Sequence, residues 1–512
     1  MKKIGIFLNF GPTTKLTTEG LGRYIGSLIK GIQEAGITVV IACPKWLKEN
    51  VEELARDLQI TVTDENFLTT RYVPPIWKLY SWLANRKKKH NDKLHISKLL
   101  KICLEKISKE ERLLNVVVEV IFIVVLGLPW LFYLSIKHVM LKGKYLLKKG
   151  IKHTINNLGV DVVDVVHESF DQMISSSATR LVNIINKSSN VDIWYIPTLF
   201  WPQVNNIRNG KIVINAPDLV TEEFPYGFAD VDGVTQTNNC RDTLNIDAHY
   251  IVYSKYIGDT LLHNKYGINS SKYSVIYHSN HDLINEIEIL DSIKVNLNLD
   301  NGTNLTDSFA KTVLASIMTD SNITGGVQLA NAEYIFYASQ FRPNKNIMNL
   351  LIAYEHLIHR KFRHERLVLT GRKNNLPADV TMYIKENGLS DEIIFCSGVS
   401  TQQLAALYRC AKLVVNPTLY EGGFPFTFGE GMSVGTPSLM SDIPQVREIT
   451  TGENVDEMLF DPYNTEVMAD KIEWGLDHVQ YLFQIELPLY QKLKQRTDES
   501  VAKEYMDVFM SL

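Results

Sequence analysis

A short apolar run, a glycine-rich turn flanked by two carboxylates and a run of small residues follow one another near residue 420. This order constrains the fold more than any other feature of the chain. Residues 413–415, Leu-Val-Val, are typical of a short buried strand. The segment 420–439 reads YEGGFPFTFGEGMSVGTPSL, and Glu421 and Glu430 bracket its turn. The order is therefore strand, acidic turn and helix. Such a loop can aim free backbone N–H groups at an anion while its carboxylates accept hydrogen bonds from hydroxyls, as a diphosphate joined to sugars requires.

Short β-rich runs alternate with amphipathic helical stretches along most of the chain, as a parallel α/β sheet requires. Because 512 residues are too many for one ordinary core, we predict two doubly wound domains facing a cleft, with ligands at the strand C-termini. The predicted parts are a first domain (1–290), a linker (291–331), a second domain (332–484) and a C-terminal helix that packs back on the first domain (485–512). The predicted strands are 4–8, 38–42, 160–166, 192–196, 211–214, 250–253 and 275–277, then 334–338, 366–370, 393–396 and 413–415.

Composition excludes several classes of protein. The net charge is -4 and the pI is near 6.4, so nothing globally basic suggests a nucleic-acid partner. The 5 cysteines are scattered and contain no CxxC pair, which indicates neither a disulfide framework nor a zinc site. The N-terminal apolar run is short and is typical of a first strand rather than a signal peptide, so we expect a cytoplasmic protein.

An apolar stretch interrupts the first predicted domain. Residues 120–136 carry no charge, and their length alone would permit one spanning helix. The strands predicted on either side should share one sheet, so the chain must cross a membrane an even number of times or not at all. Gly127 and Pro129 split the stretch into halves too short to span. We therefore predict an insert over about 86–152 whose residues 113–141 and flanking lysines contact a membrane surface. A buried helical hairpin or an oligomer contact is the alternative.

Two cationic residues follow the first strand of the second predicted domain. Arg342 and Lys345 lie directly after 334–338 and open a helix, at the C-terminal edge of the sheet. Arginine can bind a phosphate bidentately, and lysine adds a point charge. A solvated loop whose charges do nothing is the alternative. The acidic turn on the same domain favours a phosphate site.

These motifs occur in an order that resembles glycosyltransferase family 4, and the resemblance covers most of residues 332–480. The matching segments are 340–346, 366–371, 421–437, 443–448 and 460–462, with looser matches at 20–24, 247–259 and 275–282. The family implies the GT-B fold, with two Rossmann-like domains, and a retaining enzyme that uses a nucleotide-diphospho-sugar such as a UDP- or GDP-sugar. No DxD motif stands at a plausible strand end, so we expect no metal ion and no other cofactor.

The resemblance also implies roles for individual residues. Arg342 and Lys345 would neutralise the leaving diphosphate. Glu430 would hold the ribose hydroxyls of the nucleotide, and Glu421 would lie near the transferred sugar. The other implied roles are backbone contacts to sugar or phosphate (Gly422, Gly423 and Phe424), a close approach to the diphosphate (Gly22) and a polar group at the sugar (Asp218).

The chain departs from the family pattern at two places. Eight residues separate the two glutamates, where the family usually has seven, and this makes the role of Glu421 less certain than that of Glu430. Pro217 stands before Asp218, where the family commonly has histidine. His167, after the strand predicted at 160–166, could face the cleft or be merely a hydrogen-bonded residue at a strand end. Three further histidines have no assigned role: His249, His278 and His281.

The expected function is transfer of a sugar to a glycan or lipid-linked acceptor at the cytoplasmic membrane face, in bacterial surface polysaccharide synthesis such as capsule, lipopolysaccharide or O-antigen synthesis. The protein would then be peripheral or monotopic on the inner face of the cell membrane. A catalytically inactive GT-B partner subunit of a membrane glycan-assembly complex is the alternative. A nucleotide-sugar epimerase would have no use for the apolar stretch, and nothing marks the pyridoxal-binding lysine of a phosphorylase.

Overall fold

The computed structural model describes residues 2–18, 20–74, 159–188, 190–228, 231–288, 305–317 and 329–512, with isolated positions at 77, 95–97, 109 and 115. These residues form two compact units. One unit comprises Met1–Ile214 with Asp242–Ala248, and the other comprises Asn215–Arg241 with His249–Leu512. The domain boundaries expected near residues 290, 331 and 484, and the packing of the C-terminal helix on the first domain, stay predictions.

The predicted apolar insert at 86–152 falls outside the described residues, apart from five positions at 95–97, 109 and 115. Within the described part of the chain, no helix combines the length and the apolar character that crossing a membrane requires. Membrane contact through 113–141 therefore stays a prediction.

The first sheet has 7 strands in the order β3-β2-β1-β6-β7-β8-β9. β1 pairs in parallel with β2 and with β6. The strands are β1 (Lys3–Phe7), β2 (Thr38–Cys43), β3 (Phe67–Thr69), β6 (Ile193–Ile196), β7 (Lys211–Ala216), β8 (His249–Val252) and β9 (Tyr273–Val275). The helices of these segments are α1 (Gly20–Glu34), α2 (Lys45–Asp57), α7 (Val162–Ser188), α8 (Val220–Glu223), α9 (Val231–Leu244) and the π-helix η5 (Tyr256–Lys265). The strand order reverses beside β1, as in a doubly wound sheet.

The strand predicted at 160–166 is wrong. Only Gly159–Asp161 is extended, as β5, and it pairs antiparallel with β4 (His95–Ser97) in a separate two-stranded sheet. The helix α7 begins at Val162 and therefore contains His167. The run VVDVV has strand-like composition, but the residues after it follow a helical period, with Ala178, Leu181 and Ile185 buried. The helix pattern overrides the local β propensity. The strand that shares the sheet of β1 after the insert is β6.

The second sheet has 6 strands in the order β12-β11-β10-β13-β14-β15. Its strands are β10 (Tyr334–Tyr337), β11 (Arg366–Leu369), β12 (Ile393–Phe395), β13 (Leu413–Asn416), β14 (Ser438–Ser441) and β15 (Leu459–Phe460). The helices of this part are α11 (Leu305–Ala315), α13 (Ile347–His359), α14 (Ala378–Glu386), α15 (Thr401–Cys410), α16 (Phe426–Ser433), α17 (Pro444–Arg447), α18 (Val455–Met458), α19 (Thr465–Asp477), α20 (Val479–Lys494) and α21 (Asp498–Ser511). From β10 the chain first adds β11 and β12 on one side of the sheet and then β13, β14 and β15 on the other side, as in a doubly wound sheet.

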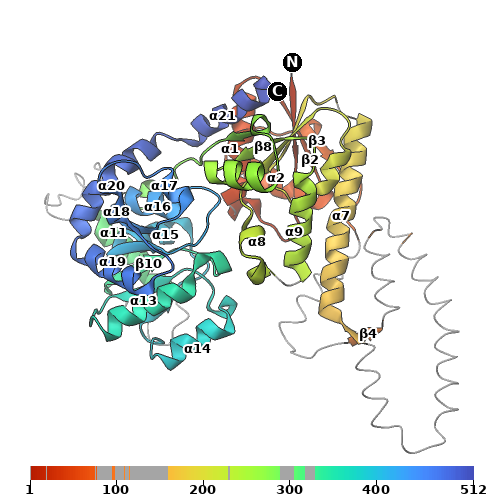
Figure 1. Ribbon diagram of the computed structural model, residues 1–512. Coiled ribbons are helices and arrows are strands. Elements are labelled where there is room, and N and C mark those ends of the chain that lie inside the picture. The colour runs from red at the N-terminus through yellow and green to blue at the C-terminus, as the bar shows by residue number, and fades with distance from the viewer. Residues whose placement is uncertain are drawn as a thin grey trace, which may run out of the picture. The chain divides into compact units, whose positions relative to one another are not determined.

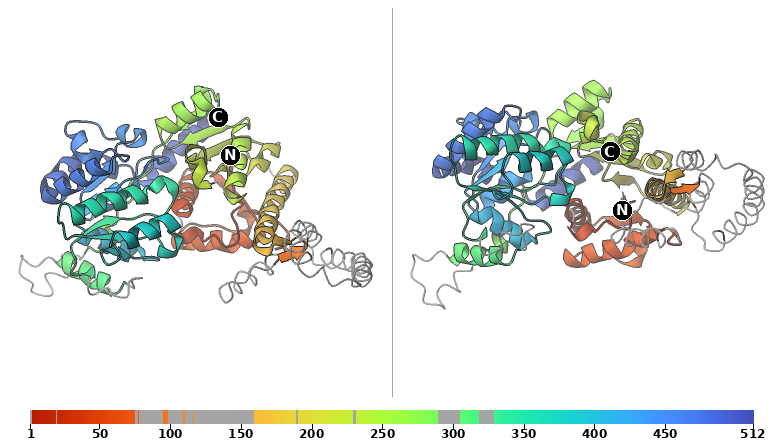
Figure 2. Two further views of the ribbon diagram at one scale, coloured as in Figure 1. Left: turned by 60° about the horizontal axis from the view of Figure 1, so that its bottom comes forward. Right: turned by 90° about the horizontal axis from the view of Figure 1, so that it is seen from below.

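Helices cover both faces of the second sheet (Figure 1, Figure 2). Alternate residues of β10 show why, because successive side chains of a strand point to opposite faces. Tyr334 and Phe336 belong to a core that contains α11 and α15 residues, whereas Ile335 and Tyr337 belong to a core formed with α13, α14 and α19. A strand buried on both faces has the continuous apolar sequence that the second domain shows.

The structure differs from the sequence prediction in two further segments of the second unit. Residues 305–315, inside the predicted linker, form α11, whose buried Ala310, Val313 and Leu314 have helical spacing. The C-terminal segment forms two helices, α20 and α21, where one was predicted.

The core of the second unit contains a carboxyl group. Glu486 of α20 is fully buried, and both its oxygens accept from the backbone N–H of Ser438 in β14, at 3.0 and 3.3 Å. Burial raises the pKa of this carboxyl well above its ordinary value near 4.5. The folded protein therefore keeps this proton to a higher pH than the unfolded chain does.

We predict that Glu486→Gln is more stable than the parent protein at pH 8, by a few degrees in Tm, and that this difference shrinks towards pH 5. With a raised folded pKa, the contribution of Glu486 to stability is present below the unfolded pKa and is lost as the pH rises through the folded pKa. Glutamine keeps an acceptor for Ser438 and cannot ionise. Thermal unfolding at both pH values measures the difference, with the exposed Glu466→Gln as the control. An equal Tm difference at both pH values would contradict the prediction.

Candidate functional site

Two loops leave the carboxyl ends of β10 and β13, the neighbouring strands at which the order of the second sheet reverses. In doubly wound sheets, ligands bind at this position. The loop after β10 passes through the 3₁₀ turn η8 (Pro343–Lys345) into α13. The loop after β13 contains the acidic turn and enters α16. Because β10 and β13 are parallel, both loops emerge at one edge of the sheet.

Hydrogen bonds join the two loops. The Asn344 side chain donates to the Tyr420 carbonyl at 2.9 Å, and the Asn344 carbonyl accepts from the backbone N–H of Leu419 at 2.8 Å. Asn346 has φ = 55°, a left-handed conformation that asparagine tolerates, and its side chain donates to the Pro417 carbonyl at 3.0 Å. These contacts fix the position of Lys345 between Asn344 and Asn346.

Lys345 pairs with the first glutamate of the acidic turn. Its Nζ lies 2.5 Å from Oε1 of Glu421, and the two side chains are 23% and 19% exposed. Arg342 is exposed, and its guanidinium donates to the Gln340 side chain at 3.1 Å. Glu421 is therefore in the site although eight residues separate it from Glu430.

A cavity of about 460 Å³, which we name the first cavity, lies at these loops within the second unit. It is lined by eight of the predicted site residues: Asp218, Arg342, Lys345, Glu421, Gly422, Gly423, Phe424 and Glu430. The start of α16 also lines it, at Pro425, Phe426 and Thr427. The first N–H groups of a helix have no partner within the helix and favour an anion. The first cavity thus combines cationic side chains, helix N–H groups and carboxylates.

The two glycines of the acidic turn are required by close packing. A Cβ at Gly422 would overlap the carbonyl oxygen of Pro217, and a Cβ at Gly423 would lie 2.9 Å from the His278 ring. The Gly422 carbonyl also accepts from the Ser254 hydroxyl at 2.9 Å. Pro217, which stands where the family commonly has histidine, therefore contacts the acidic turn through its backbone.

Asp218 lines the first cavity with an exposed side chain. Desolvation at the cavity wall raises the pKa of its carboxyl, and the hydrogen bond from the Val220 N–H and the positive charges of Arg342 and Lys345 act in the opposite direction. Asp218 is thus placed with the cationic loop, as a polar group that can hydrogen-bond a ligand hydroxyl.

His278, which had no role in the sequence analysis, lines the first cavity together with Tyr253. Its ring lies between Tyr253 and Phe426, with centroid distances of 3.9 and 4.6 Å. Burial, with a smaller effect from Arg496, lowers the pKa of His278 to about 4, so that the ring is neutral at physiological pH. The resemblance at 275–282 was the one sequence signal that pointed to this residue.

Glu430 lies in α16 and has two side-chain partners. His281 Nδ1 lies 2.7 Å from Oε1, and the Tyr408 hydroxyl donates to Oε2 at 2.6 Å. His281, like His278, had no predicted role, and Tyr408 was not singled out because its register relative to Glu430 depends on the packing of α15 against α16.

Gly22, the ninth predicted residue, lies in the first turn of α1 in the first unit. A Cβ there would overlap the carbonyl oxygen of Leu16, so the local chain path itself requires glycine. The approach of Gly22 to a diphosphate stays a prediction.

Residues 332–478 match the family described as Glycosyl transferases group 1. An Escherichia coli protein described as O-antigen chain mannosyltransferase B is 34% identical over 124 residues, which are 24% of this chain and 32% of that protein. The chain spans between 17% and 37% of the length of the curated relatives that it matches.

Two of the solved structures that resemble this chain have the following TM-scores. HepE of Anabaena, solved with UDP-glucose, has a TM-score of 0.55 at 12% identity, with 100% of both chains covered. Sucrose-phosphate synthase of Thermosynechococcus elongatus has a TM-score of 0.54 at 13% identity, with 100% of this chain and 99% of that chain covered. The predicted fold class, GT-B with two Rossmann-like domains, is confirmed.

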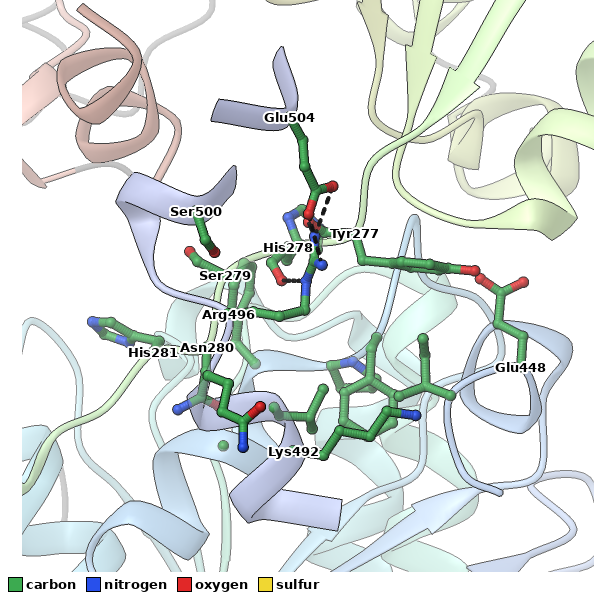
Figure 3. A pocket seen from close by; sticks show the side chains of 17 residues that line it. Tyr277, His278, Ser279, Asn280, His281, Glu448, Lys492, Arg496, Ser500 and Glu504 are labelled. Atoms are coloured by element: carbon green, nitrogen blue, oxygen red, sulfur yellow. Dashed lines mark hydrogen bonds and ion pairs between the residues drawn. The ribbon is translucent and has the colours of Figure 1, made fainter. Parts of the chain in front are cut away.

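A second cavity of about 540 Å³ adjoins the first and shares His278 and the segment 424–426 with it. Figure 3 shows Arg496 at its centre, beside Tyr277 and Glu504. The Arg496 guanidinium donates to the carbonyls of Tyr277 and His278 and pairs with Glu504 at 2.9 Å. These contacts attach the α20–α21 connection to the segment that follows β9.

Proposed function

We propose that this protein is a retaining glycosyltransferase that moves a sugar from a UDP- or GDP-sugar to a glycan or lipid-linked acceptor, without a metal ion. One observation carries the proposal: Lys345, Arg342, the start of α16 and the two glutamates of the acidic turn line a single cavity in the matched domain. A cavity of this composition suits a diphosphate attached to a ribose and a sugar.

In the proposed reaction the bond between the anomeric carbon and a phosphate oxygen breaks, and the acceptor hydroxyl forms the new bond to that carbon while its proton passes to the departing diphosphate. Negative charge grows on the departing diphosphate. Lys345, Arg342 and the helix N–H groups are placed to stabilise this negative charge. Preorganised positive groups accelerate a reaction when they stabilise charge that develops in the transition state. Glu421 would lie near the transferred sugar, and Asp218 would hydrogen-bond its hydroxyls. Glu430 would hold the ribose.

Surface polysaccharide synthesis is the proposed context. Its support is the relative described as an O-antigen chain mannosyltransferase. The structural neighbour solved with UDP-glucose supports the proposed class of donor. The apolar residues 113–141, with lysines on both sides, support a place at the cytoplasmic membrane face, where a lipid-linked acceptor would be within reach.

Incubation of the purified full chain with a panel of UDP- and GDP-sugars and lipid-linked acceptors tests the proposal. We expect one donor to be consumed, with release of its nucleoside diphosphate, a product of unchanged anomeric configuration by NMR, and equal rates with and without EDTA. The same preparation should float with anionic vesicles. Failure to bind or consume any nucleotide-sugar would favour the inactive partner subunit instead.

A further inference from the structure

Both oxygens of the Glu430 carboxylate already have a protein partner, His281 on Oε1 and Tyr408 on Oε2. An ionised carboxylate only accepts hydrogen bonds, so His281 must carry a proton on Nδ1. Burial raises the pKa of the Tyr408 phenol well above its ordinary value, and the Glu430 carboxylate adds to this effect. The Tyr408 hydroxyl therefore remains a donor at physiological pH.

The remaining acceptor positions of Glu430 match a diol. A carboxylate offers about four lone-pair positions, two on each oxygen. His281 and Tyr408 use one position each, on different oxygens, so one position remains free on each oxygen. The Glu430 side chain is 12% exposed and lines the first cavity. Two acceptors on one carboxylate fit two neighbouring hydroxyls, such as those of a ribose.

The chain holds His281 on both sides by backbone contacts. The Asn280 N–H donates to the Arg496 carbonyl at 2.9 Å, and the Leu283 N–H donates to the Ser433 hydroxyl at 2.9 Å. Ser433 belongs to α16, the helix that carries Glu430. In Figure 3, the His281 ring lies at the edge of the second cavity and is turned away from the other labelled side chains.

The neighbouring carboxylate, Asp282, is engaged with other groups. Its Oδ2 accepts from the Tyr490 hydroxyl at 2.9 Å and lies 3.4 Å from Lys494 Nζ, and its Oδ1 accepts from the Ile284 N–H at 3.1 Å. Asp282 and Glu430 therefore have different partners, and the contact at 2.7 Å with Glu430 is made by the His281 imidazole.

From this arrangement we propose that His281 is a positioning residue for donor binding. Its Nδ1–H, with the Tyr408 hydroxyl, fixes the Glu430 carboxylate in the orientation that accepts both ribose hydroxyls of a nucleoside diphosphate. The inference rests on the proposed function and extends it, because it assigns recognition of the ribose to a unit of three residues from separate segments of the second unit.

Calorimetric titration of the full chain with UDP and GDP, and with their 2′,3′-dideoxy counterparts, tests the inference. For the nucleotide that the parent protein binds, His281→Ala should weaken binding about tenfold or more, as expected for loss of a hydrogen bond to a charged group. The dideoxy counterpart, which lacks both hydroxyls, should bind the parent protein and His281→Ala almost equally. Glu430→Gln should show the same dependence on the hydroxyls.

Two conservative variants separate positioning from a purely structural role. The amide nitrogen of asparagine can take the place of Nδ1, whereas that of glutamine extends to the place of Nε2. We therefore expect His281→Asn to regain most of the affinity and His281→Gln to regain little. The exposed His364→Ala serves as the control for loss of a histidine, and Tm measurements establish that each variant is folded.

Equal losses with the ribose and dideoxy nucleotides, or equal affinities of His281→Asn and His281→Gln, would overturn the role of His281 and leave the proposed function standing. A parent protein that binds neither UDP nor GDP would overturn the proposed function itself.

Discussion

Lys345→Ala is expected to lower kcat at least about 100-fold while leaving the protein folded. The Lys345 ammonium lies at the first cavity and pairs with Glu421. Removing one preorganised group at a developing negative charge costs about 3 kcal/mol, which corresponds to about 150-fold in rate. The change also leaves the Glu421 carboxylate unpaired beside the proposed position of the departing diphosphate, and this repulsion adds to the loss. Steady-state kinetics with the active donor gives kcat and KM, and circular dichroism with a thermal melt reports on folding.

Arg342→Ala should act in the same direction, because the Arg342 guanidinium lines the same cavity. Lys385→Ala, on the outer surface of α14, removes an exposed lysine without touching the cavity and is the matched control. Adding Glu421→Gln to Lys345→Ala should recover part of the lost rate, since the unpaired carboxylate is then neutral. Near-normal kcat in both single variants would refute the assignment of these two residues.

The parts of the site that sequence alone could predict are those that follow from strand order. Lys345 and Glu421 lie 76 positions apart, yet each follows a parallel strand of one doubly wound sheet, and such strands end at a common edge. A local signal in the sequence marks the start of α15, Thr401–Cys410. Ser400 begins a capping box with Gln403, which marks the start of the helix.

The parts that sequence could not predict depend on contacts between distant segments. His281 and Glu430 are 149 positions apart, and the spacing of apolar residues in either segment does not show that the imidazole reaches the carboxylate. The strand predicted from the β-branched run at 160–166 failed because composition cannot distinguish a short strand from the first turn of a long helix. The contact between Gly422 and Pro217 likewise depends on where two loops meet in three dimensions.

Gly422→Ala is expected to lower kcat/KM at least about 100-fold, although it adds one methyl group to a residue with no proposed chemical step. A Cβ at this position would overlap the Pro217 carbonyl oxygen, and it would lie 3.1 Å from the Asp218 Cβ. The obstacle is backbone, which cannot rotate away as a side chain can, so the acidic turn must shift. Glu421 would shift with it, and a misplacement of about 1 Å in a reacting geometry can cost about 100-fold in rate.

The same substitution should lower the free energy of unfolding by about 1–3 kcal/mol, the usual cost of overpacking a well-packed site. The shift also lengthens the hydrogen bond from the Ser254 hydroxyl to the Gly422 carbonyl, now 2.9 Å. Gly11→Ala is the matched control for stability, because a Cβ there would make an ordinary contact at 3.4 Å with Phe170. Denaturant unfolding of the two variants measures the difference. If Gly422→Ala kept the stability and kcat/KM of the parent protein, the acidic turn would not be held against Pro217, and its glycines would need another explanation.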